Sequence, residues 1–202
     1  MNVQRSDEWF ESRLGIPTCS MYSAVLAKGE GKTRSAYMLK LAAERLTGKR
    51  AESFSNGHTD RGEVQETFAQ MAYEARTGNV VQEVGFIRHP VLLTGGSPDG
   101  LIDFDGGLEI KSVIPTVQIE TIRKGGYPSG HKPQIQGNLM NTGRDWWDFE
   151  SYSPDLPEGL DVYIFRVERD QSYIDNLESE IIRFNKELDA MVEALNALMV
   201  AA

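Results

Sequence analysis

Two carboxylates and one lysine in the middle of the sequence have the types and spacing that suit metal-assisted cleavage of phosphodiesters. Asp99 lies in the segment SPDG, and ten residues later Glu109 begins the segment EIK, which ends at Lys111. Asp99 and Glu109 offer the hard oxygen ligands that Mg²⁺ prefers. Lys111 should lie on the same strand face as Glu109, because side chains alternate along a strand. It can therefore stand beside an attacking water and the negative charge that develops during cleavage.

The turn between the two strands decides whether these groups meet. A two-residue turn would point Asp99 away from Glu109, since side chains alternate across a sheet. A three-residue loop, residues 104–106, would pair Asp99 with Lys111 and put all three polar groups on one face. Such loops commonly end with a residue in the left-handed region, which Gly106 tolerates. We therefore expect the longer loop.

A further carboxylate precedes this segment. Glu66 falls in the early turns of an expected helix and can add a third acidic group to the same pocket. The spacing alone does not establish a site, because an Asp-Gly turn between charged strands is common on protein surfaces.

The elements that would position these residues follow from hydrophobic spacing. Apolar residues at steps of three and four predict helices at 33–47 and 60–77, ended by Gly48 and Gly78. Short β-rich segments separated by glycine, proline and aspartate predict an antiparallel meander over 79–113. Further helices are expected at 115–123 and 133–141, and further strands at 146–152 and 161–168.

This order of elements predicts an α/β or α+β sandwich with the sheet in the middle. The fold class that we expect is α/β, with a central mixed β-sheet flanked by helices. Because no long linker or low-complexity segment marks a boundary, residues 1–202 are expected to form a single domain. The last helix, 170–199, repeats its apolar residues every seven positions. This stripe can pack along its own domain or form a coiled coil between subunits.

The composition restricts cofactors and partners. No segment approaches the roughly 18 apolar residues of a membrane span, and charges occupy the N-terminus, which indicates a cytoplasmic protein. The single cysteine, Cys19, excludes an internal disulfide and a multi-cysteine zinc cluster. The net charge of -9 opposes binding to nucleic acid. Most of the net negative charge lies in the last quarter, however, so the basic residues of the first quarter either form a positive surface or are scattered solubilising charges.

Several segments spread over most of the chain carry a family resemblance. They are Trp9, Arg13-Leu14-Gly15, Thr18-Cys19-Ser20, Gly62 with Glu66, 97–101, 107–111, Gln134-Ile135-Gln136 and 167–170. Together they resemble phage lambda exonuclease and its relatives, the YqaJ-like viral recombinases of the PD-(D/E)XK nuclease superfamily. The resemblance implies a restriction-endonuclease-like PD-(D/E)XK core.

This resemblance implies an enzyme that enters at the end of linear double-stranded DNA. It would degrade the 5′-ended strand and leave a 3′ single-stranded tail for phage-type recombination. Asp99, Glu109 and Lys111 would form the catalytic triad. The backbone carbonyl of Ile110 and the carboxylate of Glu66 would complete the coordination of two Mg²⁺ ions, for which Mn²⁺ can substitute.

The resemblance also implies contacts and partners. Arg13 and Ser20 would bind the terminal 5′-phosphate, a role that suits an arginine fork and a hydroxyl donor, and Gln134 would lie near the active site. Relatives form a ring-shaped homotrimer around DNA and work beside a single-strand annealing recombinase in bacterial cells that carry a phage or prophage. Cys19 and residues 112–115 depart from the family pattern, so substrate contacts within 114–130 transfer least.

Other interpretations fit the same residues. A structure- or site-specific endonuclease can be built on the same core, and so can a non-catalytic DNA-binding subunit. Taken singly, Arg13 could form a surface salt bridge with Glu8 or Glu11, and Ser20 could cap a helix. His131 could contact DNA or face solvent.

Overall fold

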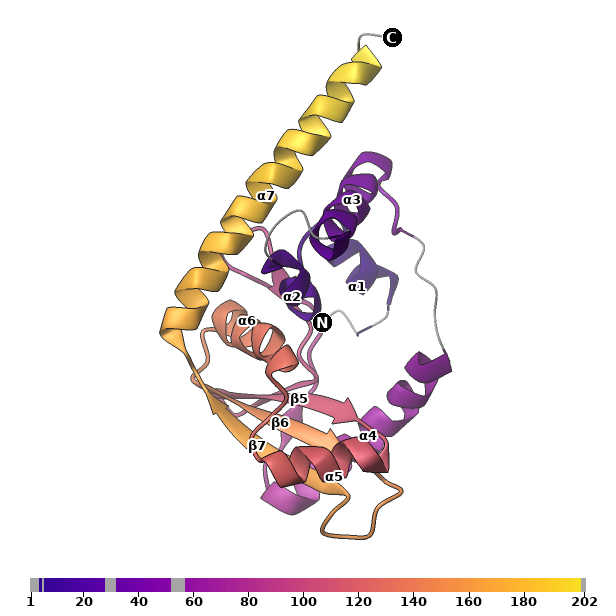
Figure 1. Ribbon diagram of the computed structural model, residues 1–202, viewed down its shortest axis with the longest axis vertical. Coiled ribbons are helices and arrows are strands. Elements are labelled where there is room, and N and C mark those ends of the chain that lie inside the picture. The colour runs from indigo at the N-terminus through magenta and orange to yellow at the C-terminus, as the bar shows by residue number, and fades with distance from the viewer. Residues whose placement is uncertain (1–3, 5, 28–31, 52–56, 201–202) are drawn as a thin grey trace.

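The central feature is a five-stranded mixed sheet between two layers of helices (Figure 1). The computed structural model describes residues 4, 6–27, 32–51 and 57–200, without the side chains of 57–64 and 200. In sheet order the strands are β1 (Val81–Gln82), β4 (Gly100–Ile102), β5 (Gly106–Ser112), β6 (Trp146–Tyr152) and β7 (Val162–Glu168). The pair β5–β6 is parallel and the others are antiparallel. The predicted fold class is therefore confirmed.

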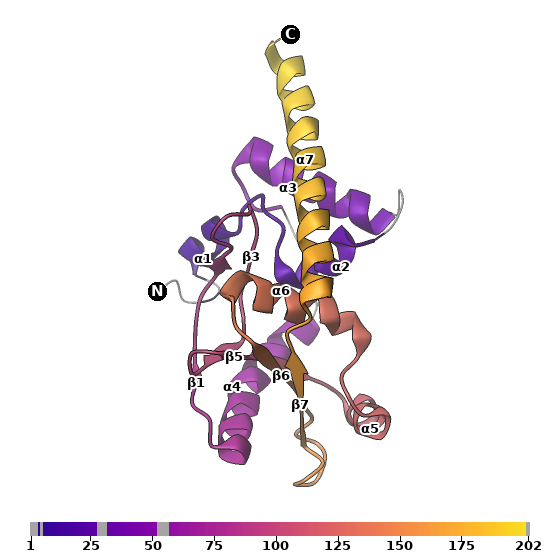
Figure 2. The same ribbon diagram turned by 90° about the vertical axis from the view of Figure 1, so that its left-hand side faces the viewer.

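Each face of the sheet is covered by its own helices. On one face α4 (Gly57–Thr77) packs Ala69 and Tyr73 against apolar residues of β4 and β5. On the other face Trp147 and Phe149 join a larger core. The helices of that layer are α2 (Tyr22–Val25), α3 (Lys32–Thr47), α6 (Lys132–Thr142) and α7 (Gln171–Val200), as Figure 2 shows.

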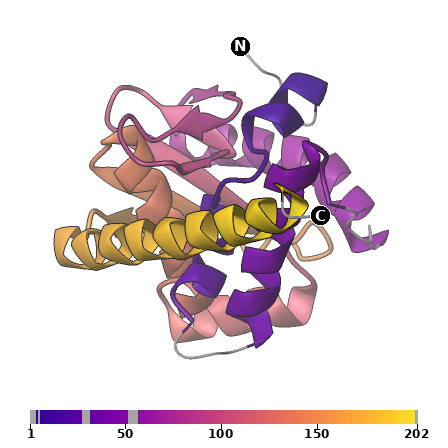
Figure 3. The same ribbon diagram turned by 90° about the horizontal axis from the view of Figure 1, so that it is seen from above.

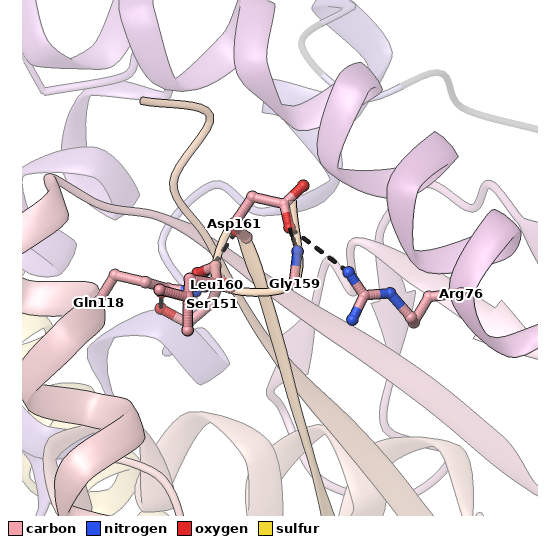
Figure 4. A network of polar contacts seen from close by, with 6 residues as sticks. All are labelled: Arg76, Gln118, Ser151, Gly159, Leu160 and Asp161. Carbon is pink, nitrogen blue, oxygen red and sulfur yellow. Dashed lines mark hydrogen bonds and ion pairs between the residues drawn. The ribbon is translucent and has the colours of Figure 1, made fainter. Parts of the chain in front are cut away.

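A polar network ties α5 (Pro115–Lys124) to the sheet (Figure 4). The buried amide of Gln118 donates to the carbonyl oxygens of Ser151 at 2.9 Å and Leu160 at 3.1 Å. The hydroxyl of Ser151 donates back to Gln118 Oε1 at 2.5 Å. Beside Leu160, the carboxylate of Asp161 pairs with Arg76 of α4 at 3.4 Å. The loop between β6 and β7 thereby connects α4 with α5.

The long helices begin and end close to the expected residues. Gly48 and Gly78, with φ angles of 64° and 75°, follow α3 and α4 as predicted. The short helices near the N-terminus were not predicted: α1 (Asp7–Ser12), η1 (Cys19–Met21) and α2. The expected meander over 79–113 is wrong, because β2 (Ile87–Arg88) and β3 (Gly95–Gly96) form a separate two-stranded sheet.

The register of the β4–β5 hairpin differs from the prediction. Its loop has three residues, but Gly106 already belongs to β5, where it pairs with Ile102. The predicted pairing of Asp99 with Lys111 is therefore wrong, and continuing the observed register places Asp99 opposite Glu109. The observed pairing is shifted from the predicted one by two residues. Because side chains alternate between the two faces, each side chain still lies on its predicted face of the sheet.

Within β5, Gly106 packs closely against the neighbouring strand β6. A Cβ atom on Gly106 would lie 2.1 Å from the indole ring of Trp146, so glycine is required there for close packing. The residue in the left-handed region is Asp103, with a φ of 46°. Aspartate tolerates this conformation better than most residues.

The apolar stripe of α7 is buried along its first half. Figure 3 shows α7 lying across the molecule, and its contacts with α3 and α6 bury five residues of the stripe, namely Ile174, Leu177, Ile181, Phe184 and Leu188. Leu195 and Leu198, near its end, are 40% and 67% exposed. The first half of the stripe thus packs along its own domain. No helix in the described part of the chain is long and apolar enough to cross a membrane.

Candidate active site

A buried ion pair lies at the centre of the candidate site. Glu109 of β5 is 0% exposed, and its Oε1 contacts the ammonium group of Lys111. On the same face of the sheet, Asn138 of α6 directs its Nδ2 to Glu109 Oε2 at 3.4 Å. The side chain of Lys111 is 30% exposed. The ammonium group therefore connects the buried carboxylate with the solvent side of the sheet.

Asp99 lies at the edge of β5, next to the start of β4. Its Oδ2 accepts a hydrogen bond of 2.6 Å from the backbone N–H of Ile110. The N–H and C=O of one strand residue point to the same neighbouring strand. The carbonyl oxygen of Ile110 thus faces the edge where Asp99 lies.

The charges of the cluster act on one another. Burial raises the pKa of Glu109, and Asp99 and Glu66 raise it further, although Lys111 acts in the opposite direction. Burial disfavours the charged form of Lys111, but Glu109, Asp99 and Glu66 outweigh it and raise the lysine pKa. The charges of three acidic groups therefore act on one ammonium group within this cluster.

The donor set fits a divalent cation such as Mg²⁺. The available groups are three carboxylates and one backbone carbonyl, all of them hard oxygen donors. A bound cation would also reduce the electrostatic repulsion among the carboxylates. Within the described ranges, no three His, Cys, Asp or Glu side chains converge closely enough to form a preformed metal cluster. Glu109 instead contacts Lys111.

A cavity of about 160 Å³ gathers the residues that the resemblance connects with the 5′ end. Arg13, Ser20 and Gln134, far apart in sequence, all line it. Its other lining residues are Gln4, Trp9, Thr18, Cys19 and Ser97. Ser97 stands two residues before Asp99, so the cavity adjoins the segment that carries the first carboxylate of the cluster.

Aromatic stacking holds Arg13 in this cavity. Its guanidinium lies 3.9 Å from the ring centroid of Trp9, and Trp9 Nε1 donates to Ser97 Oγ at 2.8 Å. Burial lowers the pKa of Arg13, but arginine stays charged in proteins. Among the described residues, no ion pair joins Arg13 to Glu8 or Glu11. The cation is thus held by a ring that is itself bonded to the segment leading to Asp99.

Ser20 and Gln134 line the cavity from two different helices, η1 and α6. Ser20 is exposed within η1, and its Oγ lies 3.4 Å from Thr18 Oγ1. It lies inside the turn and does not serve as a helix cap. Gln134 is half-buried in the first turn of α6.

Comparison with known proteins identifies the family. The model of the YqaJ-like viral recombinase domain matches residues 8–145, which include Arg13, Gln134 and the segments that carry Asp99 and Glu109. This chain belongs to the YqaJ-like viral recombinase family. A comparison with curated proteins gave no match.

Solved structures share the fold of this YqaJ-like chain over nearly its whole length. An alkaline exonuclease, LHK-Exo from Laribacter hongkongensis, is 36% identical with a TM-score of 0.90, covering 97% of this chain and 99% of that one. LHK-Exo in complex with dAMP gives 37% identity and a TM-score of 0.91 over the same shares. A phage-related exonuclease from Haemophilus somnus 129PT shares the fold at 14% identity, with a TM-score of 0.71, covering 89% and 96% of the two chains.

The sequence did not predict the positions of two residues near the YqaJ-like site, Asn138 and His131. Asn138 was not singled out, although it follows Gln134 by four positions and so lies on the same side of α6. His131 is half-buried and stacks on Phe149 at a centroid distance of 5.4 Å, and the charge of Lys111 acts on it. It therefore belongs to the surroundings of the ion pair.

The substitution His131→Phe should make the YqaJ-like domain less sensitive to acid. Burial, and then Lys111, lower the pKa of His131 from 6.5 to about 4. As the pH falls through this window, the unfolded chain binds a proton that the folded chain resists, so stability is lost. Between pH 7 and pH 4 the free energy of unfolding of the variant should fall by roughly 1–2 kcal/mol less than that of wild type, a figure reduced because the side chain is partly exposed. Urea unfolding at each pH measures this, and identical pH profiles would contradict it.

Proposed function

We propose that the chain is a Mg²⁺-dependent exonuclease that degrades the 5′-ended strand of linear double-stranded DNA and leaves 3′ single-stranded tails for phage-type recombination. The observation that carries the proposal is the position of the cavity lined by Arg13, Ser20 and Gln134 beside the segment of Asp99. LHK-Exo supports it, because it is an alkaline exonuclease whose complex with dAMP holds a mononucleotide, the kind of product that an exonuclease releases.

In this proposal the residues of β5 and its edge perform the hydrolysis. Asp99, Glu109, Glu66 and the carbonyl of Ile110 would hold two Mg²⁺ ions, with Mn²⁺ as a substitute. Bound ions would supply positive charge to the scissile phosphate and lower the pKa of an attacking water. Lys111 orients that water and stabilises negative charge through Nζ, and Glu109 keeps the ammonium group in position.

The cavity residues select the end of the strand. A terminal phosphate carries more charge than an internal one, so a fixed guanidinium favours a 5′-phosphorylated end. Arg13 is suited to this because its stacking on Trp9 holds it in place before DNA arrives. Ser20 and Gln134 add hydroxyl and amide donors to the lining of the same cavity.

Linear duplex DNA labelled at each end in turn, with and without Mg²⁺, tests the proposed function. We expect the 5′ label to leave early as a mononucleotide, the 3′ label to remain in long strands, and no release without the metal. Cleavage of closed circular DNA would favour the structure- or site-specific endonuclease. DNA binding without hydrolysis at any Mg²⁺ concentration would favour the non-catalytic DNA-binding subunit.

The substitution Arg13→Ala should weaken the preference for 5′-phosphate over 5′-hydroxyl ends by about tenfold, the loss of one charge-assisted contact. Hydrolysis rates on the two kinds of end measure this preference, and the metal dependence should stay the same. Arg76→Ala is a control, because that arginine is exposed on α4 and pairs with Asp161. Equal preference in wild type and Arg13→Ala would exclude the assigned role.

We also propose that the chain acts as a ring-shaped homotrimer around DNA, beside a single-strand annealing recombinase, in the cytoplasm of a bacterial cell that carries a phage or prophage. The family resemblance supports this assembly. Light scattering should give three times the mass of one chain, and a monomer mass at working concentration would contradict the ring.

A further inference from the structure

Glu150 is a buried carboxylate that the proposed function does not use. It lies on β6, where it pairs with Ile110 of β5 on one side and Ile164 of β7 on the other. It is 0% exposed, and neither of its oxygens has a hydrogen-bond partner within the described parts of the chain. Strand alternation places it on the face where Ile110 and Ile164 pack beneath α4. The carboxylate is therefore buried beside two apolar strand partners.

A neighbouring residue shows how the same face accommodates an acidic side chain. Asp148, two positions earlier on β6, accepts hydrogen bonds from Arg166 at 2.9 and 3.0 Å and from the hydroxyl of Tyr73 at 2.7 Å. Paired in this way, a buried carboxylate is tolerated, whereas an unpaired one opposes folding strongly. Glu150 thus destabilises the protein at a position where an apolar residue would fit the surroundings.

Glu150 is close to the candidate site but lies on the opposite face of the sheet from Glu109. Its strand partner Ile110 donates its N–H to Asp99 Oδ2 at 2.6 Å. Burial, and then the charge of Asp99, raise the pKa of Glu150 to about 8. Asp99 also acts on Glu109, which extends from the opposite face of β5. Asp99 is therefore under the influence of acidic residues on both faces of the strand.

We propose that Glu150 is a positioning residue of the metal site, whose buried carboxylate strengthens the binding of a divalent cation at Asp99 and Ile110 through its charge. This inference rests on the proposed function, in which Asp99 holds such a cation. A cation at Asp99 reduces the cost of burying the charge of Glu150, and by reciprocity the charge of Glu150 increases the affinity for the cation. Glu150 does not touch the substrate.

The substitutions Glu150→Gln and Glu150→Met separate this role from a structural one. Without divalent cations both variants should melt at higher temperature than wild type, Met more so than Gln, because an unpaired buried carboxylate is removed. Calorimetric titration with Mn²⁺ above pH 8, where Glu150 is charged, should show a Kd on the order of tenfold weaker, the usual effect of a residue that supports metal ligands. The increase in melting temperature on addition of Mn²⁺ should be smaller in both variants than in wild type. A higher Mg²⁺ concentration should restore their hydrolysis of DNA.

Asp148→Asn is the matched control, because it removes a buried carboxylate from the same strand and face. It should melt at lower temperature, since Arg166 loses its partner, and bind Mn²⁺ as wild type does. Variants of Glu150 that bind Mn²⁺ like wild type would overturn the inference, as would lower melting temperatures for both Gln and Met. If wild type itself bound no Mn²⁺, the proposed metal-dependent function would fail, and the inference with it.

Discussion

Replacing Lys111 by alanine should slow hydrolysis of linear duplex DNA on the order of a thousandfold while DNA binding persists. The ammonium group is the one cation that contacts Glu109 among the described residues, and it reaches from the buried carboxylate toward solvent. In the proposed mechanism its loss removes the group that orients water and stabilises negative charge. Release of labelled nucleotides in Mg²⁺ measures cleavage, and binding is measured in Ca²⁺.

Two further variants make the Lys111 result interpretable. Lys111→Gln keeps a hydrogen-bond donor for Glu109 but no charge, so it separates loss of catalysis from exposure of an unpaired buried carboxylate. Lys124→Ala is the matched control, because that lysine is 73% exposed and pairs with Glu120 on the surface of α5. Wild-type cleavage by Lys111→Ala would remove the lysine from the mechanism.

The substitution Asp99→Asn should abolish metal-dependent hydrolysis to a similar extent, on the order of a thousandfold, because a charged oxygen donor is lost. Asparagine retains an oxygen that can accept the N–H of Ile110, so the hairpin should keep its structure. The measurements are the Mg²⁺ dependence of hydrolysis and the increase in melting temperature with Mn²⁺.

A control for Asp99→Asn lies at the other end of β4. Asp103→Asn also replaces a carboxylate by an amide, at the hairpin-loop residue whose backbone is left-handed. Asparagine tolerates this backbone conformation as well. The substitution should leave metal dependence unchanged. If Asp99→Asn and wild type required the same Mg²⁺ concentration and reached the same rate, Asp99 would not be a ligand.

The two candidate centres are connected through one segment of chain. Trp9 stacks on Arg13 and bonds to Ser97, and Ser97 leads directly to Asp99. The cavity proposed to bind a terminal phosphate is therefore linked to the acidic cluster through residues 97–99. Such a link favours cleavage at a defined distance from the strand end, which is what removal of nucleotides from an end requires.

Buried charge within the site has a cost in stability. Glu109 is fully buried with one ammonium partner, and Glu150 is fully buried without a hydrogen-bond partner in the described structure. A fold selected for stability alone would place apolar side chains at such positions. Their presence beside Asp99 is the pattern expected where function and stability compete.

Local features of the sequence predicted the long helices and the mixed α/β class. The ends of α3 and α4 follow from Gly48 and Gly78, because a helix end depends on residues within one turn of it. The strand pairing over 79–113 was predicted wrongly. Which strands pair depends on residues far apart in the chain, and Gly106 shows this directly, since the ring that requires a glycine belongs to Trp146.

The types and spacing of Asp99, Glu109 and Lys111 were enough to propose the chemistry, because alternation along a strand is a local rule. Only the tertiary structure gathered Arg13 and Gln134 around one cavity, and only it showed that Glu150 lacks a hydrogen-bond partner among the described residues. A cavity and an unsatisfied carboxylate are both defined by what surrounds a side chain. Those surroundings come from segments distant in sequence, brought together by packing of the two faces of the sheet.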